Sequence, residues 1–327
     1  MMLLAEAADA ALECSAVGSF SRIGLWVRSR LLPEFTAGAP ETLEGRSVVI
    51  TGATSGIGYA TATGLARLGA AVHFLARDRA RAACARRRIA AASGSQRISY
   101  GLADLDDPGS VRAFAAGYLS AHDRLDVLIH NAGAVHPSYQ TDAAGTELTV
   151  AGQVIAPFLL TSLLLPALLA ARQSRVITVS SAGMYTQRLD PATLQMPASG
   201  YRGVTAYARA KRAQVALSRE WARRLAGTEV AFHAMHPGWV NTPGIAAALP
   251  RFHRAMRPLL RTPGQGADTI IWLTASDPAR LGSGRFWHDR RPRAQYRLPG
   301  TREAPTAARV LWDHIESSQR RPARHPA

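Results

Sequence analysis

The sequence predicts an α/β fold in which about seven strands form a doubly wound parallel sheet with helices on both faces. Short β-branched runs alternate with alanine-rich stretches of helical length through most of the 327 residues. A glycine-rich turn joins the first such run to the first helical stretch, and no repeat or low-complexity linker divides the chain. Strands that alternate with helices in this way are typical of a parallel sheet with crossover helices.

Each expected element follows from this alternation. Strands are expected at residues 47–51, 71–75, 97–101, 125–130, 175–180, 228–234 and 285–288. Helices are expected at residues 57–68, 78–92, 108–121, 148–171 and 205–226. Stretches that contain Pro and Gly, at 33–45 and 292–305, mark the edges of the sheet domain. We therefore expect an N-terminal extension with an amphipathic helix (1–44), one domain (45–300), and a C-terminal helix with a basic tail (301–327).

One expected helix needs a separate argument, because residues 148–171 carry no charged side chain. A stretch of that length is long enough to span a bilayer. It lies, however, between two strand-like runs, and neighbouring parallel strands must be joined by a crossover. We expect a buried crossover helix.

Composition limits the classes of function. The net charge of +16 raises non-specific association with anionic surfaces, but the arginines form no stripe with interleaved aromatic residues, so we expect no specific nucleic-acid binding. Cys14 and Cys84 fit neither a disulfide framework nor a metal site, which favours a cytoplasmic protein without a metal. Residues 20–35 are amphipathic at helical spacing: packing over the domain is favoured, and peripheral contact with a membrane stays open.

The chain has 39 Lys and Arg residues, and only one of them, Lys211, is a lysine. It follows Tyr207 by four residues, so the two side chains share one face of the expected helix. A compact ammonium near a phenol favours the phenolate and lowers the phenol pKa. The pair therefore indicates that Tyr207 acts as an acid or base.

The glycine-rich turn is Thr51-Gly52-Ala53-Thr54-Ser55-Gly56-Ile57-Gly58. Glycines at such a turn let the backbone approach a pyrophosphate, which then lies on the amide groups at the start of the helix. The spacing differs from the usual Gly-x-Gly-x-x-Gly fingerprint. Its position between a strand and a helix still favours a dinucleotide site of the Rossmann type.

These motifs, together with Asn131-Ala-Gly133, Val179-Ser-Ser181 and Pro237-Gly238 in the same order, resemble the short-chain dehydrogenase/reductase superfamily over residues 45–290. Further segments, among them Met235-His-Pro-Gly-Trp239 and Gln265-Gly-Ala-Asp-Thr269, are similar to the branch called dehydrogenase/reductase SDR family member 12. The resemblance implies an enzyme that interconverts a carbonyl and an alcohol with a nicotinamide cofactor.

The resemblance also implies which residues bind the cofactor. The implied set is Thr51, Gly52, Thr54, Ser55, Gly56, Ile57, Gly58, Asp104, Leu105, Asn131, Ala132, Gly133, Tyr207, Lys211, Pro237, Gly238, Val240 and Thr242. Arg77 stands where members that use NAD typically have an acidic residue, and Asp78 follows it. Because a guanidinium can bind a 2′-phosphate, NADP(H) is favoured over NAD(H).

In the implied mechanism Tyr207 transfers the proton, Lys211 lowers its pKa and binds the ribose, and Ser181, rather than the adjacent Ser180, donates to the substrate oxygen. Gln153 takes the place of an Asn that links the lysine to solvent in many members. If Gln153 fails in that role, the alternative is a catalytically weak sensor that binds NADP(H).

The substrate and the oligomeric state are the last expectations. Apolar residues after Ser181 and after Gly238 are expected to line a pocket for a lipophilic ketone, aldehyde or secondary alcohol. These residues are Met184, Tyr185, Leu189, Leu194, Met196, Tyr201, Trp239, Ile245, Leu249 and Phe252. The resemblance further implies a homo-oligomer that pairs through the crossover helix and its neighbour.

Overall fold

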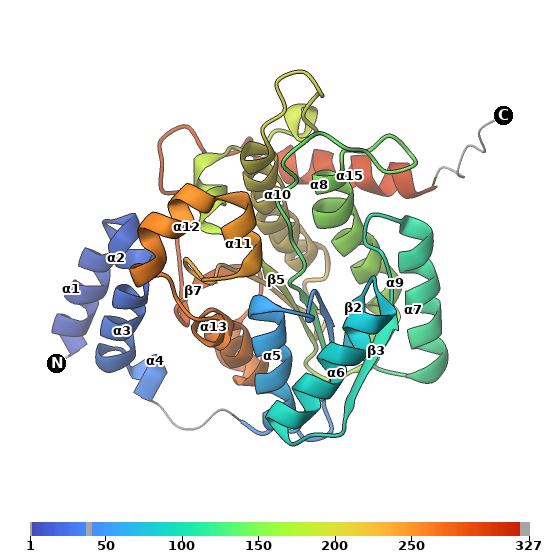
Figure 1. The fold of residues 1–327 in the computed structure, drawn as a ribbon, viewed down its shortest axis with the longest axis horizontal. Helices are drawn as coiled ribbons and strands as arrows, with labels where there is room; N and C mark the ends of the chain where they lie inside the picture. The colour runs from blue at the N-terminus through green and yellow to red at the C-terminus, as the bar shows by residue number, and fades with distance from the viewer. Residues whose placement is uncertain (1, 37–40, 321–327) are drawn as a thin grey trace.

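The computed structural model describes residues 2–36 and 41–320. Its centre is one sheet with the strand order β3-β2-β1-β4-β5-β6-β7-β8 (Figure 1). The strands are β1 (Ser47–Thr51), β2 (Ala71–Ala76), β3 (Ile98–Leu102), β4 (Val127–His130), β5 (Arg175–Val179), β6 (Ala231–Met235), β7 (Arg285–His288) and β8 (Arg291–Pro292). Strands β1 to β7 pair in parallel, and β8 pairs antiparallel with β7. The expected doubly wound α/β fold is confirmed.

Two details differ from the expectation. An eighth strand is added by a tight hairpin whose turn residues, Asp289 and Arg290, have φ angles of 50° and 60°. Strand β6 begins at Ala231 rather than at 228, because the chain is still in the turn that follows the preceding helix, where the Thr228 N–H donates to the Leu225 carbonyl.

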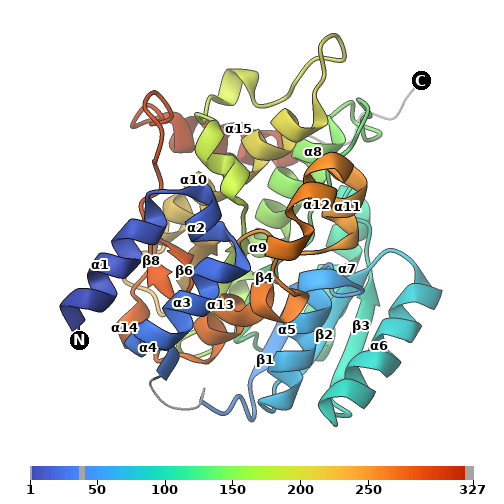
Figure 2. The ribbon, with the colours of Figure 1, turned by 60° about the vertical axis from the view of Figure 1, so that its left-hand side comes forward.

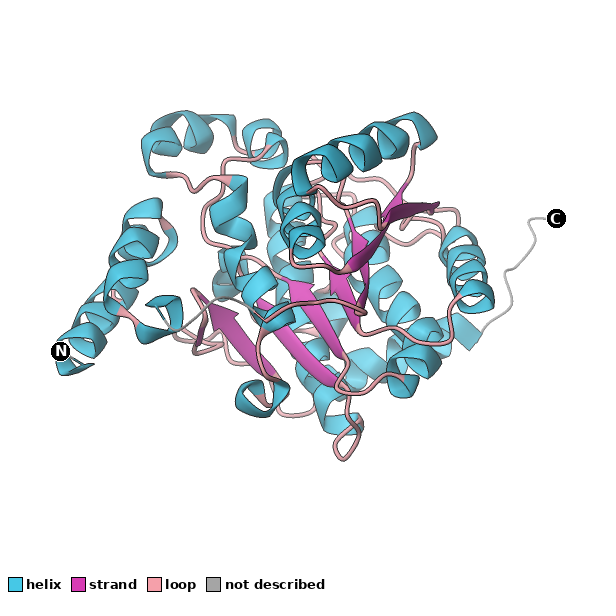
Figure 3. Ribbon diagram, turned by 90° about the horizontal axis from the view of Figure 1, so that it is seen from below, coloured by secondary structure: helices cyan, strands magenta, loops and turns pink. Residues whose placement is uncertain are grey.

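Helices cover both faces of the sheet (Figure 3). One face carries α5 (Gly56–Arg67), α6 (Arg79–Ser93) and α13 (Pro263–Ala275). The other carries α7 (Pro108–Ala121), α9 (Ala156–Ala170), α10 (Gly203–Arg224) and α15 (Ala307–Arg320). Short helices fill the connections: α8 (Leu148–Val150), α11 (Pro243–Ala248), α12 (Pro250–Met256), α14 (Pro278–Leu281), η2 (Ala182–Thr186), η3 (Pro191–Thr193) and η4 (Arg257–Leu259).

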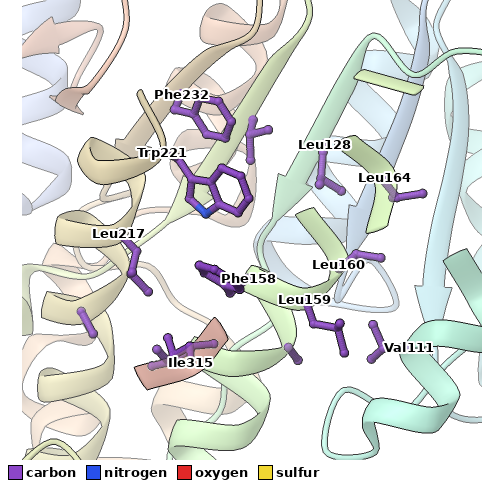
Figure 4. Packing of buried hydrophobic residues seen from close by; sticks show 14 of the residues in the cluster. Val111, Leu128, Phe158, Leu159, Leu160, Leu164, Leu217, Trp221, Phe232 and Ile315 are labelled. Carbon is purple, nitrogen blue, oxygen red and sulfur yellow. The ribbon is translucent and has the colours of Figure 1, made fainter. Parts of the chain in front are cut away.

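The uncharged stretch forms a crossover from β4 to β5, as expected. It consists of α8, a π-helical segment η1 (Ala151–Ile155), and α9. Within the described residues it is the one stretch long and apolar enough to cross a membrane by composition. Phe158 on this crossover packs against Trp221 of α10 and Trp312 of α15, with ring centroids 5.2 and 4.6 Å apart, in the core seen in Figure 4. The stretch is thus a largely buried helix of the domain.

The N-terminal residues form α1 (Met2–Glu13), α2 (Ala16–Phe20), α3 (Arg22–Leu31) and α4 (Pro33–Thr36). They lie beside the β7–β8 end of the sheet (Figure 2). The amphipathic stretch 20–35 is divided in the structure: Ser21 is extended and caps α3 through its hydroxyl, Leu32 ends α3, and α4 follows. The basic tail expected at the C-terminus falls mostly on 321–327, outside the described residues.

Candidate active site

A cleft of about 790 Å³ opens at the carboxyl ends of the central strands. It lies next to β1 and β4, where the order of the strands reverses, which is the usual ligand position in open α/β sheets. Its volume falls in the range of small-molecule and cofactor sites. The predicted cofactor and catalytic residues line it, apart from Thr51.

The glycine-rich turn forms one wall of the cleft. Gly52 and Gly56 have φ angles of 70° and 56°, in the left-handed region that favours glycine. A Cβ atom on Gly58 would overlap the Gly52 carbonyl and the Asn131 amide nitrogen. The turn therefore packs tightly against β1 and Asn131, and α5 begins at Gly56, which lines the cleft. The start of a helix favours a bound anion.

Thr51 and Asn131 brace this turn from behind. The Thr51 hydroxyl accepts from the Asn131 and Ala132 backbone N–H groups, each at 3.0 Å. The Asn131 side-chain amide donates to the carbonyls of Thr51 and Gly52 at 3.0 and 3.1 Å. Thr51 does not line the cleft, and its buried hydroxyl is used by the backbone, so in this structure it shapes the turn.

The far end of the cleft carries the residues expected near the adenine. Asp104 and Leu105 line it together with Arg77. Arg77 is largely exposed, and its closest acidic partner is Asp106 at 3.9 Å. Sequence reasoning missed Arg81, which also lines the cleft. Arg81 lies in the first turn of α6, just after the loop that carries Arg77, and this position next to the expected 2′-phosphate site was the available signal.

The carboxylate of Asp78 stabilises the start of α6. It caps α6, accepting from the Arg81 N–H at 2.7 Å. This contact uses one of the two oxygens of the carboxylate. Asp78, Asp104 and Asp106 line this end of the cleft together with Arg77 and Arg81, so it carries both signs of charge, and the two guanidinium groups are the ones that could bind a phosphate.

Ser181, Tyr207 and Lys211 meet on the opposite wall. Ser181 follows β5, and the two other residues lie one turn apart on α10. The Lys211 Nζ atom is 5.3 Å from the centre of the Tyr207 ring, and the Ser181 side chain lies near enough to the Tyr207 hydroxyl to lower its pKa. Ser180 is excluded from the same role, because its buried hydroxyl donates to the Lys211 carbonyl at 2.9 Å.

The electrostatics differ from the expectation for the Tyr207–Lys211 pair. Burial raises the pKa of Tyr207, and the nearby Ser181 side chain lowers it by less. Burial also lowers the pKa of Lys211 to about 7. The expected lowering of the phenol pKa by Lys211 is wrong for this structure, because the ammonium donates to the Val179 carbonyl at 2.9 Å and to Gln214 at 3.1 Å rather than to the phenol.

Gln153 lies beside the lysine, in the π-helical segment. Its amide nitrogen donates to the Ala134 carbonyl at 2.5 Å, while its buried Oε1 atom has no partner among the described residues. That oxygen and Lys211 Nζ would lie 3.1 and 3.0 Å from a Cβ atom added to Gly133. Because a buried acceptor without a partner is costly, its position at the cleft fits a bound water or ligand hydroxyl.

Sequence reasoning missed Gln214, which connects these groups. Its Oε1 atom accepts from Lys211, and its amide nitrogen donates to the Gln153 carbonyl at 2.6 Å. Gln214 stands three residues after Lys211, so helical spacing again held the signal. It holds the lysine against the crossover helix.

The apolar residues expected to line a substrate pocket divide into two groups. Trp239, Ile245, Leu249 and Phe252 line the cleft, together with Val204, which sequence reasoning missed. The six residues expected from the loop after Ser181 do not line it. Five of them, Met184, Tyr185, Leu189, Leu194 and Met196, are buried.

The sixth residue of that loop, Tyr201, is half-buried and bonds Glu147 at 2.9 Å. This part of the expectation is wrong, because the loop folds inward as 3₁₀ turns and packs on the core instead of facing the cleft.

The comparisons agree with this site. The short chain dehydrogenase family model matches residues 46–250, so the chain belongs to that family. Dehydrogenase/reductase SDR family member 12 from Homo sapiens is 40% identical over 76% of this chain and 78% of its own length. Human retinol dehydrogenase 11 is 35% identical over 83% of this chain and 85% of its own length.

A solved structure, a putative short chain dehydrogenase from Shigella flexneri complexed with NADP, superposes with a TM-score of 0.62 at 25% identity, covering 77% of this chain and all of that one. The chain is thus an NAD(P)-dependent oxidoreductase of the short-chain dehydrogenase family. The glycine turn that has no room for a Cβ atom and the unpartnered Gln153 acceptor fit such a cofactor.

Proposed function

We propose that this protein is an NADP(H)-dependent oxidoreductase that interconverts a lipophilic ketone or aldehyde with its alcohol, with Tyr207 as general acid and base. The observation that carries the proposal is the meeting of Ser181, Tyr207 and Lys211 on the wall that faces the glycine-rich turn. A dinucleotide bound along the turn would lie in the cleft that these three side chains also line.

The nicotinamide, when bound, supplies or accepts the hydride. The residues of the chain manage the charge and the proton. In the reducing direction the Tyr207 hydroxyl donates its proton to the substrate oxygen, and Ser181 donates a hydrogen bond to the same oxygen as negative charge develops there. A raised phenol pKa keeps Tyr207 protonated at neutral pH.

Lys211 would bind the ribose hydroxyls. Its pKa of about 7 leaves the amine only partly charged without cofactor. Ribose oxygens, as acceptors, favour the ammonium form. A water on the free Gln153 oxygen would connect this amine to solvent.

The preference for NADP(H) is supported by two guanidinium groups at the adenine end of the cleft. Arg77 and Arg81 line it, and the Asp78 carboxylate is used as a helix cap. A guanidinium can bind a phosphate through two parallel bonds. The NADP-bound neighbour from Shigella flexneri supports the same preference.

The substrate class is supported by the apolar wall of Trp239, Ile245, Leu249 and Phe252. The family resemblance to retinol dehydrogenases, which are named for a lipophilic alcohol, points the same way.

The test measures oxidation of NADPH and of NADH by absorbance over a panel of apolar and polar ketones and aldehydes. We expect turnover with apolar carbonyls and NADPH. Replacing Ser181 by Ala should lower kcat by about 10²-fold through loss of one oxyanion donor, whereas the neighbouring Ser180→Ala variant should keep kcat. Equal rates for the two variants would contradict the assigned roles.

A catalytically weak sensor is the second candidate function. The observation that favours it is the tether of Lys211 to Gln214 and Val179, which holds the amine away from the phenol. Tight NADPH binding in the absence of turnover on the whole panel would support this candidate over the first.

Peripheral membrane contact through residues 20–35 is also proposed, alongside a cytoplasmic location. Ile23 and Trp26 on α3 are 49% and 55% exposed. Sedimentation with phosphatidylserine vesicles should retain the protein, and Trp26→Glu should release it, whereas Val310→Glu, at 51% exposure on α15, should not. Absence of sedimentation at low salt would reject an anionic membrane as a partner. A gel-shift assay at low salt is the parallel test for nucleic acid, and absence of a shift would reject that partner.

The homo-oligomer remains a proposal as well. The face formed by α9 and α10 is the one expected to pair, and α15 covers part of it. The ring centroids of Trp312 on α15 and Trp221 on α10 are 4.4 Å apart. Leu169 of α9 is still 48% exposed. Light scattering of the full chain measures its state, and a Leu169→Glu variant that shifts a dimer to a monomer would support pairing through α9.

A further inference from the structure

The wall of the cleft formed by residues 237–242 is held from behind by a distant part of the chain. The Trp239 N–H donates to the Phe20 carbonyl at 2.8 Å. The Trp239 carbonyl accepts from the Arg261 N–H at 2.7 Å, and the Asn241 N–H donates to the Arg261 carbonyl at 2.8 Å. The backbone of this wall is therefore fixed by Phe20 of α2 on one side and by Arg261 on the other.

The ring of Phe20 fills the space behind the same wall. It is buried, and it meets His236 and Trp239 edge to face, with ring centroids 4.7 and 5.8 Å apart. It also stacks on Tyr185 at 6.3 Å, in the 3₁₀ turn that follows Ser181. One side chain of the N-terminal segment thus packs against two parts of the chain that border the catalytic residues.

Arg261 connects the wall to the N-terminal segment through its side chain. Its guanidinium is buried and donates to the carbonyls of Ser19 and Ser21 at 3.1 and 3.2 Å and to that of Pro237 at 3.2 Å. Gly238, with a φ angle of 78°, has no room for a side chain, because a Cβ atom would lie 2.5 Å from Arg261 Nε and 2.7 Å from the Phe20 carbonyl.

A buried ionic network locks this arrangement. Asp289, in the turn of the β7–β8 hairpin, accepts from Arg261 at 2.6 and 2.9 Å and from Arg28 of α3 at 2.8 Å. Arg28 in turn donates to Asp9 of α1 at 2.7 Å and to the Ser19 carbonyl at 2.8 Å. Burial opposes the charge of Asp289, but Arg261, His288 and Arg28 outweigh it and hold the pKa of this carboxyl well below its usual range.

We propose that Phe20, Arg28, Arg261 and Asp289 are positioning residues of the active site, through which the N-terminal helices hold residues 237–239 against the nicotinamide and substrate end of the cleft. The proposal rests on the proposed function for what that end of the cleft binds. The phosphate and adenine end is built from β1, α5 and the ends of β2 and β3, which make none of these contacts. Loosening the N-terminal contact should therefore affect one end of the cleft and spare the other.

The test compares two variants of the full chain, Phe20→Leu and Phe114→Leu. Phe114 is about as buried as Phe20, but it lies on α7 and does not line the cleft, so it controls for a general loss of stability. Arg28→Lys is a third variant, which keeps the charge but loses the planar fork. Three properties are measured: amide exchange at Trp239 and Asn241, affinity for NADPH, and affinity for 2′,5′-ADP, which reaches only the adenine end.

In Phe20→Leu and Arg28→Lys we expect exchange at Trp239 and Asn241 to quicken by about tenfold or more through local opening. NADPH affinity should fall by about tenfold, since small misplacements at a reacting centre are costly, and 2′,5′-ADP affinity should change by less than about twofold. kcat/KM should fall with NADPH affinity wherever turnover is measured. Phe114→Leu should lower the melting temperature by a similar amount, but it should leave amide exchange at Trp239 and NADPH affinity unchanged.

Unchanged exchange at Trp239 in Phe20→Leu, an equal loss of affinity for both nucleotides, or the same pattern in Phe114→Leu would overturn the proposal. Exchange and binding do not need a substrate. Absence of turnover by the wild type on every carbonyl would therefore reject the proposed function. Amide exchange and nucleotide binding would still decide the present proposal.

Discussion

The two walls of the cleft are built from different materials. The cofactor wall, from β1 to the start of α5, is made of backbone: glycines without room for a Cβ atom, helix amides, and the Thr51–Asn131 brace. The catalytic wall is made of buried polar side chains, among them Lys211 and Gln153, supported by distant residues such as Phe20. Cofactor binding at the first wall should be weakened by substitutions that add volume. Catalysis at the second wall should be weakened by substitutions that remove a charge, a proton donor or a packing contact.

The largest expected effect belongs to the catalytic wall. Tyr207→Phe removes the proton donor and keeps the ring, so kcat should fall by about 10²- to 10⁴-fold. NADPH affinity should change little. Steady-state kinetics with a titration of protein fluorescence by NADPH checks both, and Tyr201→Phe, a half-buried tyrosine outside the cleft lining, is the matched control.

Gly58→Ala is the corresponding change on the cofactor wall. The added methyl would overlap the Gly52 carbonyl and Asn131, so the turn must move away from its present geometry. Restoring that geometry to bind NADPH would cost overpacking of about 2 kcal/mol, which corresponds to about 30-fold in NADPH affinity. Gly117→Ala on α7, where nothing lies within 4 Å of the added atom, should bind NADPH like the wild type. Normal NADPH binding by Gly58→Ala would show that the turn is not the cradle.

Arg77, at the adenine end of the cleft, should set the choice of cofactor. Arg77→Gln removes one charge near the expected 2′-phosphate, and a lost charge-assisted bond of about 1.4 kcal/mol lowers NADPH affinity about tenfold. NADH affinity should hardly change. Arg87→Gln, at an exposed position of α6 outside the cleft, is the control in calorimetric titrations with both cofactors. Equal losses for NADPH and NADH would contradict the assignment.

The smallest expected effect is a dependence of stability on pH. The pKa of Lys211 is lowered by burial from its ordinary 10.5 to about 7, so the unfolded chain binds more protons than the folded one between these values. Stability should therefore rise with pH above 7, by about 1 kcal/mol between pH 7 and 8. Urea unfolding of the wild type and of Lys211→Met at both pH values isolates this contribution, because the other titrating groups are common to both.

If the free energy of unfolding changes with pH equally in the wild type and in Lys211→Met, the lysine is fully charged in the folded protein. In that case the catalytic wall would not hold a partly neutral amine.

The glycine-rich turn could be placed from the sequence, since Gly52, Gly56 and Gly58 act through local backbone geometry. The sequence also allowed the Tyr207–Lys211 pair to be placed on one helix face. The apolar residues after Ser181 could not be placed, because an apolar side chain fits a core or a pocket equally well, and Met184 and Tyr185 pack on the core.

The remaining misses depend on contacts between distant parts of the chain. Trp239 meets Phe20, and Arg28 meets Asp289, over separations that no local motif records. The phenol pKa was misjudged for a related reason. Spacing brings Lys211 near Tyr207, but burial and the acceptors at Val179 and Gln214 decide the charge that the phenol experiences.

The most direct measurement is a crystal structure of the protein with NADPH. We expect the pyrophosphate on the turn at Gly56, the ribose at Lys211, and the nicotinamide ring between Tyr207 and the wall that contains Gly238, with space for a carbonyl at the Tyr207 hydroxyl. A nicotinamide ring outside the cleft, or a Tyr207 hydroxyl shielded from it, would contradict the account.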